Sequence, residues 1–248
     1  MTKPLFAVHE NVRGFQPAVL VWLLGDLYEL VSVDATPYDA GFHSVQRPRI
    51  YSILYLRGRV TQRRSITSTY RALALAFRQM PAPHFTEFLI ATEEELDAVE
   101  RRVRKRRGFS PLTVPRPRRW EYLLTSAQTR RLDARSQEWR DRYGTSPSDC
   151  PHCVFDLGWN FPRHTTIGDC LPTVTSNCGV WWLPYFHRWF LSLELASACG
   201  FPFRAQLAAA AGCVTAPGPY SPQQVGNAMH VASVGVALAT ALSCLEEV

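Results

Sequence analysis

Several common signatures are missing from this chain of 248 residues. It contains no G-x-G triplet, which removes the usual glycine signatures of phosphate and dinucleotide loops. It contains no Pro-Cys dipeptide, and its seven cysteines are an odd number. Because no signal peptide is recognisable, we expect reduced thiols in an intracellular protein, nuclear if the source is eukaryotic, and no disulfide framework.

Long hydrophobic runs are also scarce. The segment 228–245, "AMHVASVGVALATALSCL", nearly reaches the length of a membrane span. It is rich in Ala, Ser and Gly and carries His230. We therefore expect a buried helix there and no membrane partner.

The charge is distributed unevenly along the chain. Residues 57–142 hold 20 of the 27 basic residues and 10 of the 21 acidic ones, a net charge of +10 in that segment. The run 101–119 has nine basic residues and no acidic one. Such a run can neutralise DNA phosphates, but a solvated helix face or a nuclear localisation signal has the same composition.

The apolar patterns predict an α/β chain. Strands are expected in "PLFAVHENVRG" and "RIYSILYLRG", with a helix and a strand in the segment between them. Helices are expected in four further segments: 65–80, 92–107 with Thr92 as its cap, 126–143 and 225–245. Residues 144–187 are loop-rich, and a short helix is expected after them, stopped by Gly200 and Pro202.

Two local patterns allow more than one interpretation. Cys150 and Cys153 in "DCPHC" have the spacing of zinc ligands, and further possible ligands are His164, Cys170 and Cys178. The second pair is irregular, so reduced thiols are the default interpretation. Glu10 and Asn11 lie where the first strand ends, which is where open α/β sheets bind ligands, although a helix-capping polar pair would look the same.

Four motifs in order resemble the second half of the cytosine-5 DNA methyltransferase family. "FAVHENVRGF" is similar to the family's E-N-V strand end, and "DAGFHSVQRPRIYSILYL" is similar to its Q-x-R-x-R strand. "LPTVTSNCG" with "RWFLSLELASACGFP" resembles the motif after the family's target-recognition region, and "SPQQVGNAMHVASVGVAL" resembles its closing G-N motif.

This resemblance implies a fold and a site. The fold would be a partial, Rossmann-like S-adenosylmethionine-dependent methyltransferase sheet with an inserted, mostly helical and loop-rich recognition lobe. Residues 1–58 and 188–248 would form the core and 59–187 the lobe. Glu10 and the arginines would hold a cytosine flipped out of double-stranded DNA, while Arg188 and Glu194 would be structural partners. The expected catalytic residues are Glu10, Asn11, Arg47 and Arg49, the expected cofactor-binding residues are Gly226, Asn227 and Ala228, and no metal ligand is assigned.

The family's first half has no counterpart in this sequence: the F-x-G-x-G cofactor loop and the Pro-Cys-Gln nucleophile loop are both missing. We therefore expect a truncated methyltransferase or one subunit of a split enzyme, inactive as this chain alone, with a second chain supplying the missing half. The alternatives are a non-catalytic DNA-binding protein derived from a methyltransferase and a zinc-dependent interaction module.

Overall fold

The computed structural model describes residues 3–109, 120–158, 170–174, 180–202 and 222–248. Its contacts divide the chain into two compact units. Unit 1 comprises Met1–His84 and Ala228–Val248, and unit 2 comprises Phe85–Asn227. The sequence patterns had placed these divisions after residues 58 and 187. The first one falls later because helix α2 packs against the C-terminal helix α8 and so belongs with the sheet.

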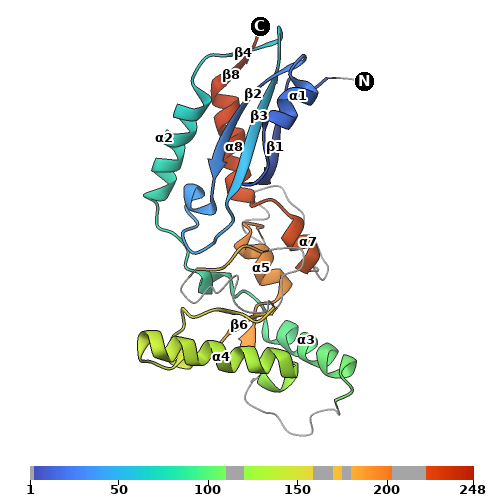
Figure 1. Ribbon diagram of the computed structural model, residues 1–248, viewed down its shortest axis with the longest axis vertical. Helices are drawn as coiled ribbons and strands as arrows, with labels where there is room; N and C mark the ends of the chain where they lie inside the picture. Colours follow the sequence, from blue (N-terminus) through green and yellow to red (C-terminus); the bar gives the residue numbers. More distant parts are fainter. Residues whose placement is uncertain (1–2, 110–119, 159–169, 175–179, 203–221) are drawn as a thin grey trace. The chain divides into compact units, whose positions relative to one another are not determined.

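Unit 1 is built on a three-stranded sheet in the order β1-β3-β2 (Figure 1). Strand β3 pairs antiparallel with both neighbours, so β1 and β2 run parallel to each other at the two edges. The helix and strands predicted for this segment are confirmed. The elements are β1 (Phe6–Val12), α1 (Ala18–Leu24), β2 (Tyr28–Ala35), η1 (Pro37–Ala40), β3 (Arg49–Leu56), β4 (Val60–Gln62), α2 (Ile66–Arg78), α8 (Val231–Cys244) and β8 (Leu245–Glu247).

The core of unit 1 lies on one face of this sheet. Because side chains alternate along a strand, Tyr51 and Ile53 of β3 point to the same face, and both are fully buried. They pack with apolar residues of α2 and α8, among them Tyr70 and Ala237. The short strands β4 and β8 pair with each other, although neither was evident from composition.

The last helix differs from the prediction of one helix over 225–245. It is split into α7 (Pro222–Asn227) and α8, with residues 228–230 between them. His230 is the N-cap of α8, and its Nδ1 accepts the backbone N–H of Ser233 at 3.2 Å. The segment Gln224–Cys244 is long and apolar enough to cross a membrane, but one face of α8 is buried against the sheet and α2, as predicted.

Unit 2 is mostly helical around a small sheet, β5-β6-β7. Its core includes Trp120, Leu123 and Trp182, which are almost completely buried. The strands of this sheet are short, which is why 144–187 looked like loops in the sequence. The elements are η2 (Phe85–Phe88), α3 (Glu93–Arg106), η3 (Glu121–Leu123), α4 (Ser126–Tyr143), η4 (Pro147–Asp149), β5 (Phe155–Asp156), β6 (Trp181–Leu183), β7 (Arg188–Trp189), α5 (Ser192–Ala198) and α7.

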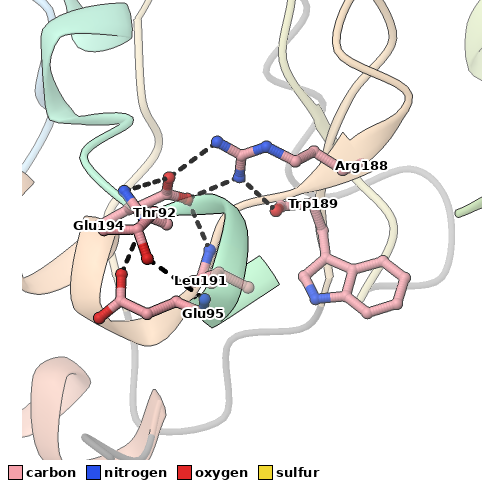
Figure 2. Close-up of polar contacts among 7 residues, drawn as sticks. Thr92, Glu95, Arg188, Trp189, Leu191 and Glu194 are labelled. Carbon is pink, nitrogen blue, oxygen red and sulfur yellow. Dashed lines mark hydrogen bonds and ion pairs between the residues drawn. The ribbon is translucent and has the colours of Figure 1, made fainter. Parts of the chain in front are cut away.

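One ion pair organises the centre of unit 2 (Figure 2). Arg188 donates two hydrogen bonds to the Glu194 carboxylate, at 2.7 and 2.8 Å. The same carboxylate accepts the backbone N–H of Leu191 at 2.9 Å, and Glu194 is completely buried. Nearby, Thr92 caps α3 as predicted, in a capping box with Glu95. The expected pairing of Arg188 with Glu194 is thus confirmed.

Candidate functional site

Three of the four predicted catalytic residues, Glu10, Arg47 and Arg49, gather where β1 ends and β3 begins. Val12 lies opposite Arg49, and Glu10 lies opposite Tyr51, so Glu10 and Arg49 are diagonal neighbours on one face of the sheet. Glu10 Oε1 lies 2.8 Å from Arg49 Nε. This oxygen has no hydrogen-bond partner among the described atoms, so the contact is an ion pair without hydrogen-bond alignment.

Arg47 joins this group from the turn that precedes β3. Its guanidinium is buried and donates to the backbone carbonyl of Ala228 at 2.5 Å. It also acts electrostatically on Tyr51 and His230. The "QRPR" segment therefore places one arginine against the start of the C-terminal segment and the other beside Glu10.

Asn11 does not belong to this group. It is adjacent to Glu10 in β1, so its side chain lies on the opposite face of the sheet. Its Oδ1 accepts the backbone N–H of Val12 at 2.8 Å. Of the four catalytic residues expected from the resemblance, the structure brings together Glu10, Arg47 and Arg49.

Tyr51 belongs to the cluster, although the sequence did not single it out. Its hydroxyl is completely buried and finds no hydrogen-bond partner among the described residues. Burial, followed by the Glu10 carboxylate, raises the pKa of Tyr51 well above its usual range. Tyr51 therefore offers a neutral O–H donor, which a pattern of apolar strand residues had concealed.

His230 was noted in the sequence only as a polar residue in an apolar run. It is 1% exposed, and its ring contacts Phe42 edge-on at 4.7 Å between centroids. Burial and the Arg47 cation lower the pKa of His230 to about 3. Since Nδ1 accepts from Ser233, the neutral ring carries its proton on Nε2, a buried atom for which the described residues supply no partner.

The predicted cofactor-binding residues lie at the junction between α7 and α8. Gly226 is buried within α7, Asn227 ends that helix with an exposed side chain, and the carbonyl of Ala228 is engaged by Arg47. This segment therefore presents one exposed polar side chain. It fits a contributor to an S-adenosylmethionine site but cannot form such a site by itself.

The zinc interpretation gains no support from the described residues. Within them, no group of three or more His, Cys, Asp or Glu side chains is placed to hold a metal ion. Burial, with a smaller contribution from Cys150, raises the pKa of the Cys153 thiol well above its usual range. His164 and Cys178 lie outside the described residues.

Unit 2 presents basic side chains that could face a polyanion. The last turn of α3 carries Arg104, Lys105 and Arg106, and the helix begins with three acidic residues. That order complements the helix dipole. Residues 110–119 of the predicted basic run lie outside the described part of the chain. A polar hollow of about 570 Å³ in the same unit is lined by Gln137, Arg140 and His187, among others.

Comparison with known proteins identifies the fold. No protein-family model matches the chain, and no curated protein matches it. Among solved structures, the chain is similar to the crystal structure of the Dnmt2 methyltransferase from S. pombe, with a TM-score of 0.52 and 14% sequence identity. The match covers 98% of this chain and 68% of that chain. The fold is that of a methyltransferase.

At 14% identity, this likeness shows the fold and no more. It confirms the α/β methyltransferase class expected from the four motifs. Glu10, Arg47, Arg49 and Tyr51, the Glu10 cluster, therefore lie at the strand ends of a methyltransferase-like sheet.

Proposed function

We propose that this chain is the base-holding and DNA-binding part of a DNA (cytosine-5-)-methyltransferase. The observation that carries the proposal is the pairing of Glu10 with Arg49, beside the buried hydroxyl of Tyr51, in a methyltransferase fold. When bound, S-adenosylmethionine supplies the methyl group. Asn227 would contact it, together with residues from outside this chain.

The cluster has the donor and acceptor groups that a cytosine ring requires. The Glu10 carboxylate can accept a hydrogen bond from the exocyclic amino group of cytosine, and an arginine can donate one to the carbonyl oxygen of cytosine. A guanidinium beside that oxygen would also stabilise negative charge that develops on the ring. Because a base inside a duplex cannot reach such a site, the cytosine must be flipped out of the helix.

Unit 2 would supply the phosphate contacts. Lys105 and Arg106 at the basic end of α3 are exposed, and their side chains are long enough to follow a DNA backbone. Binding of this kind weakens steeply as salt displaces the protein from the phosphates. The affinity for duplex DNA should fall by at least tenfold between about 50 and 200 mM salt. Affinity independent of salt would contradict these phosphate contacts.

The pairing of this chain with a second polypeptide is part of the proposal. The chain contains no Pro-Cys dipeptide and no G-x-G triplet, so the attacking thiol and most of the cofactor pocket would come from elsewhere. A tagged copy purified from its own organism with its bound partner is the sample to test. The chain purified alone should show no transfer.

Methyl transfer is tested by incubating this sample with radiolabelled S-adenosylmethionine and duplex DNA, then identifying the labelled base by mass spectrometry. The proposal predicts label in 5-methylcytosine. Label in adenine, label only in RNA supplied as the control, or no label at all would contradict it.

A non-catalytic DNA-binding role is favoured by one observation, the concentration of net positive charge in 57–142 in a chain that lacks a nucleophile motif. Salt-dependent duplex binding without any methyl transfer by the purified complex would select this second function.

A further inference from the structure

Strand β1 has an unpaired side. Among the described strands it pairs only with β3, which makes it the edge of the sheet (Figure 1). None of its seven residues is fully buried, although β3 beside it contains five buried residues in a row. Before Val12, whose N–H and C=O bond to Asn11 and Phe15, the backbone groups that point away from β3 therefore form a row open to another strand.

Helix α1, which follows β1 after residues 13–17, is also uncovered. It packs against β2 but contains no buried residue. Its outer side chains are apolar: Trp22 is 83% exposed, Leu23 59% and Val21 53%. A helix of seven residues without a side-chain cap is marginal by itself. Apolar side chains gathered on one short element indicate a contact surface rather than scattered surface residues.

We propose that the free edge of β1 and the outer side of α1 form one docking surface, and that its occupant is a second polypeptide carrying the cofactor-binding part of a methyltransferase fold. This inference rests on the proposed function. Below, "the β1/α1 surface" means the edge of Phe6–Val12 together with Val21, Trp22 and Leu23.

Three observations select this occupant. An open strand edge is satisfied by another strand, so the partner must extend the sheet. The sequence of α1, "AVLVWLL", has no charge, so it offers no phosphate contact and fits an apolar protein face. The structural match covers 98% of this chain but 68% of its neighbour, so about a third of the neighbour's length has no counterpart here.

Docking at this surface would also place the partner beside the proposed site. Glu10 lies in β1 itself, two residues from the strand's end. A strand added along the free edge would therefore run next to the residue that holds the base. In this arrangement the partner can contribute groups to the site without any change in the β1–β3 register.

The test compares three tagged forms of the chain purified from its own organism. They are the wild type, the double variant Trp22→Glu/Leu23→Glu, and the control Leu242→Glu. Leu242 is 67% exposed on α8, outside the β1/α1 surface, so this control adds one of the double variant's two negative charges elsewhere in unit 1. Circular dichroism checks that all three forms fold, which is expected because the replaced side chains are exposed.

The wild type and the control should each recover a stoichiometric partner that is labelled by S-adenosylmethionine on ultraviolet crosslinking. The double variant should recover at least about tenfold less of this partner. Hydrogen exchange at the outward-pointing amides of β1 should slow by at least about tenfold in the complex.

Any of three results would overturn the inference. The wild type could be recovered alone, it could form a dimer with a second copy of itself that the double substitution dissociates, or the double variant could keep the partner. Docking is measured by the recovery of the partner and by hydrogen exchange in β1, and neither measurement depends on catalysis. A complex that forms through this surface but transfers no methyl group to cytosine would contradict the proposed function and leave the docking surface intact.

Discussion

Two arginine–carboxylate pairs in this protein use the same chemistry for different ends. In unit 2, both oxygens of Glu194 are bonded by Arg188, and one of them also accepts the backbone N–H of Leu191 (Figure 2). In unit 1, Glu10 and Arg49 keep 15% and 12% side-chain exposure, and the contacting oxygen has no aligned hydrogen bond.

The difference separates a structural pair from the pair that we propose binds the base. A carboxylate whose oxygens are already bonded has little capacity left for a ligand, and it stabilises the fold by satisfying buried donors. A carboxylate held by charge alone keeps lone pairs available. Glu10 lies among further incompletely satisfied groups, Tyr51 and His230, which reinforces this distinction.

The largest effect is expected from breaking the structural pair. Glu194→Gln leaves Arg188 as a buried cation without its counter-charge, which should lower the free energy of unfolding of unit 2 by about 3–5 kcal/mol. Tryptophan fluorescence during chemical denaturation measures this, because six of the seven tryptophans lie in unit 2. The control Asp141→Asn, at an exposed carboxylate of α4, should leave the curve nearly unchanged. Equal denaturation curves for Glu194→Gln and Asp141→Asn would contradict a structural role for the Arg188–Glu194 pair.

A second effect tests His230 through pH. Its pKa is about 3 in the folded protein and near 6.5 when unfolded, so below pH 6.5 the unfolded chain binds the extra proton. Stability should therefore fall as the pH falls, by roughly 2 kcal/mol between pH 6.5 and pH 5. His230→Asn keeps a residue that can cap α8 and should lose most of this slope in denaturation followed by circular dichroism. An unchanged slope would show that His230 titrates normally.

The smallest effect distinguishes a satisfied hydroxyl from an unsatisfied one. Tyr70 donates to Asp39 at 3.4 Å, and Arg78 also donates to that carboxylate. Tyr70→Phe should cost about 1 kcal/mol in the thermal unfolding of unit 1. Tyr51→Phe removes a hydroxyl without a described partner and should be neutral or slightly stabilising. A larger loss for Tyr51→Phe than for Tyr70→Phe would reverse the interpretation of the cluster.

Much of the fold could be predicted from local patterns, because its helices and longer strands carry strong periodicity. Thr92 caps its helix as predicted, and the strand over Arg49–Leu56 is as expected. The pairing of β4 with β8 could not be predicted, since each has only three residues and depends on its partner. The break before His230 was missed because a buried histidine cap cannot be distinguished from a helical residue in an apolar run.

The site was predictable only in part. The resemblance indicated Glu10, Arg47 and Arg49, and the structure places them in one cluster. Alternation along β1 puts Asn11 on the other face, as strict strand periodicity would have indicated. Tyr51 was overlooked because a tyrosine in a strand is usually a core residue. Predicting that Tyr51 lies opposite Glu10 would have required knowing which strands pair.

The central claim is that Glu10 serves binding and chemistry and not folding. The most direct test is the rate of methyl transfer to cytosine by the purified complex carrying Glu10→Gln, with the free energy of unfolding measured on the same sample. Glu29→Gln, at an exposed carboxylate of β2 in the same sheet, is the control. We predict that Glu10→Gln lowers the rate by at least about 100-fold while changing stability by about 1 kcal/mol or less. An unchanged rate, or a rate that falls only as far as the protein unfolds, would contradict the claim.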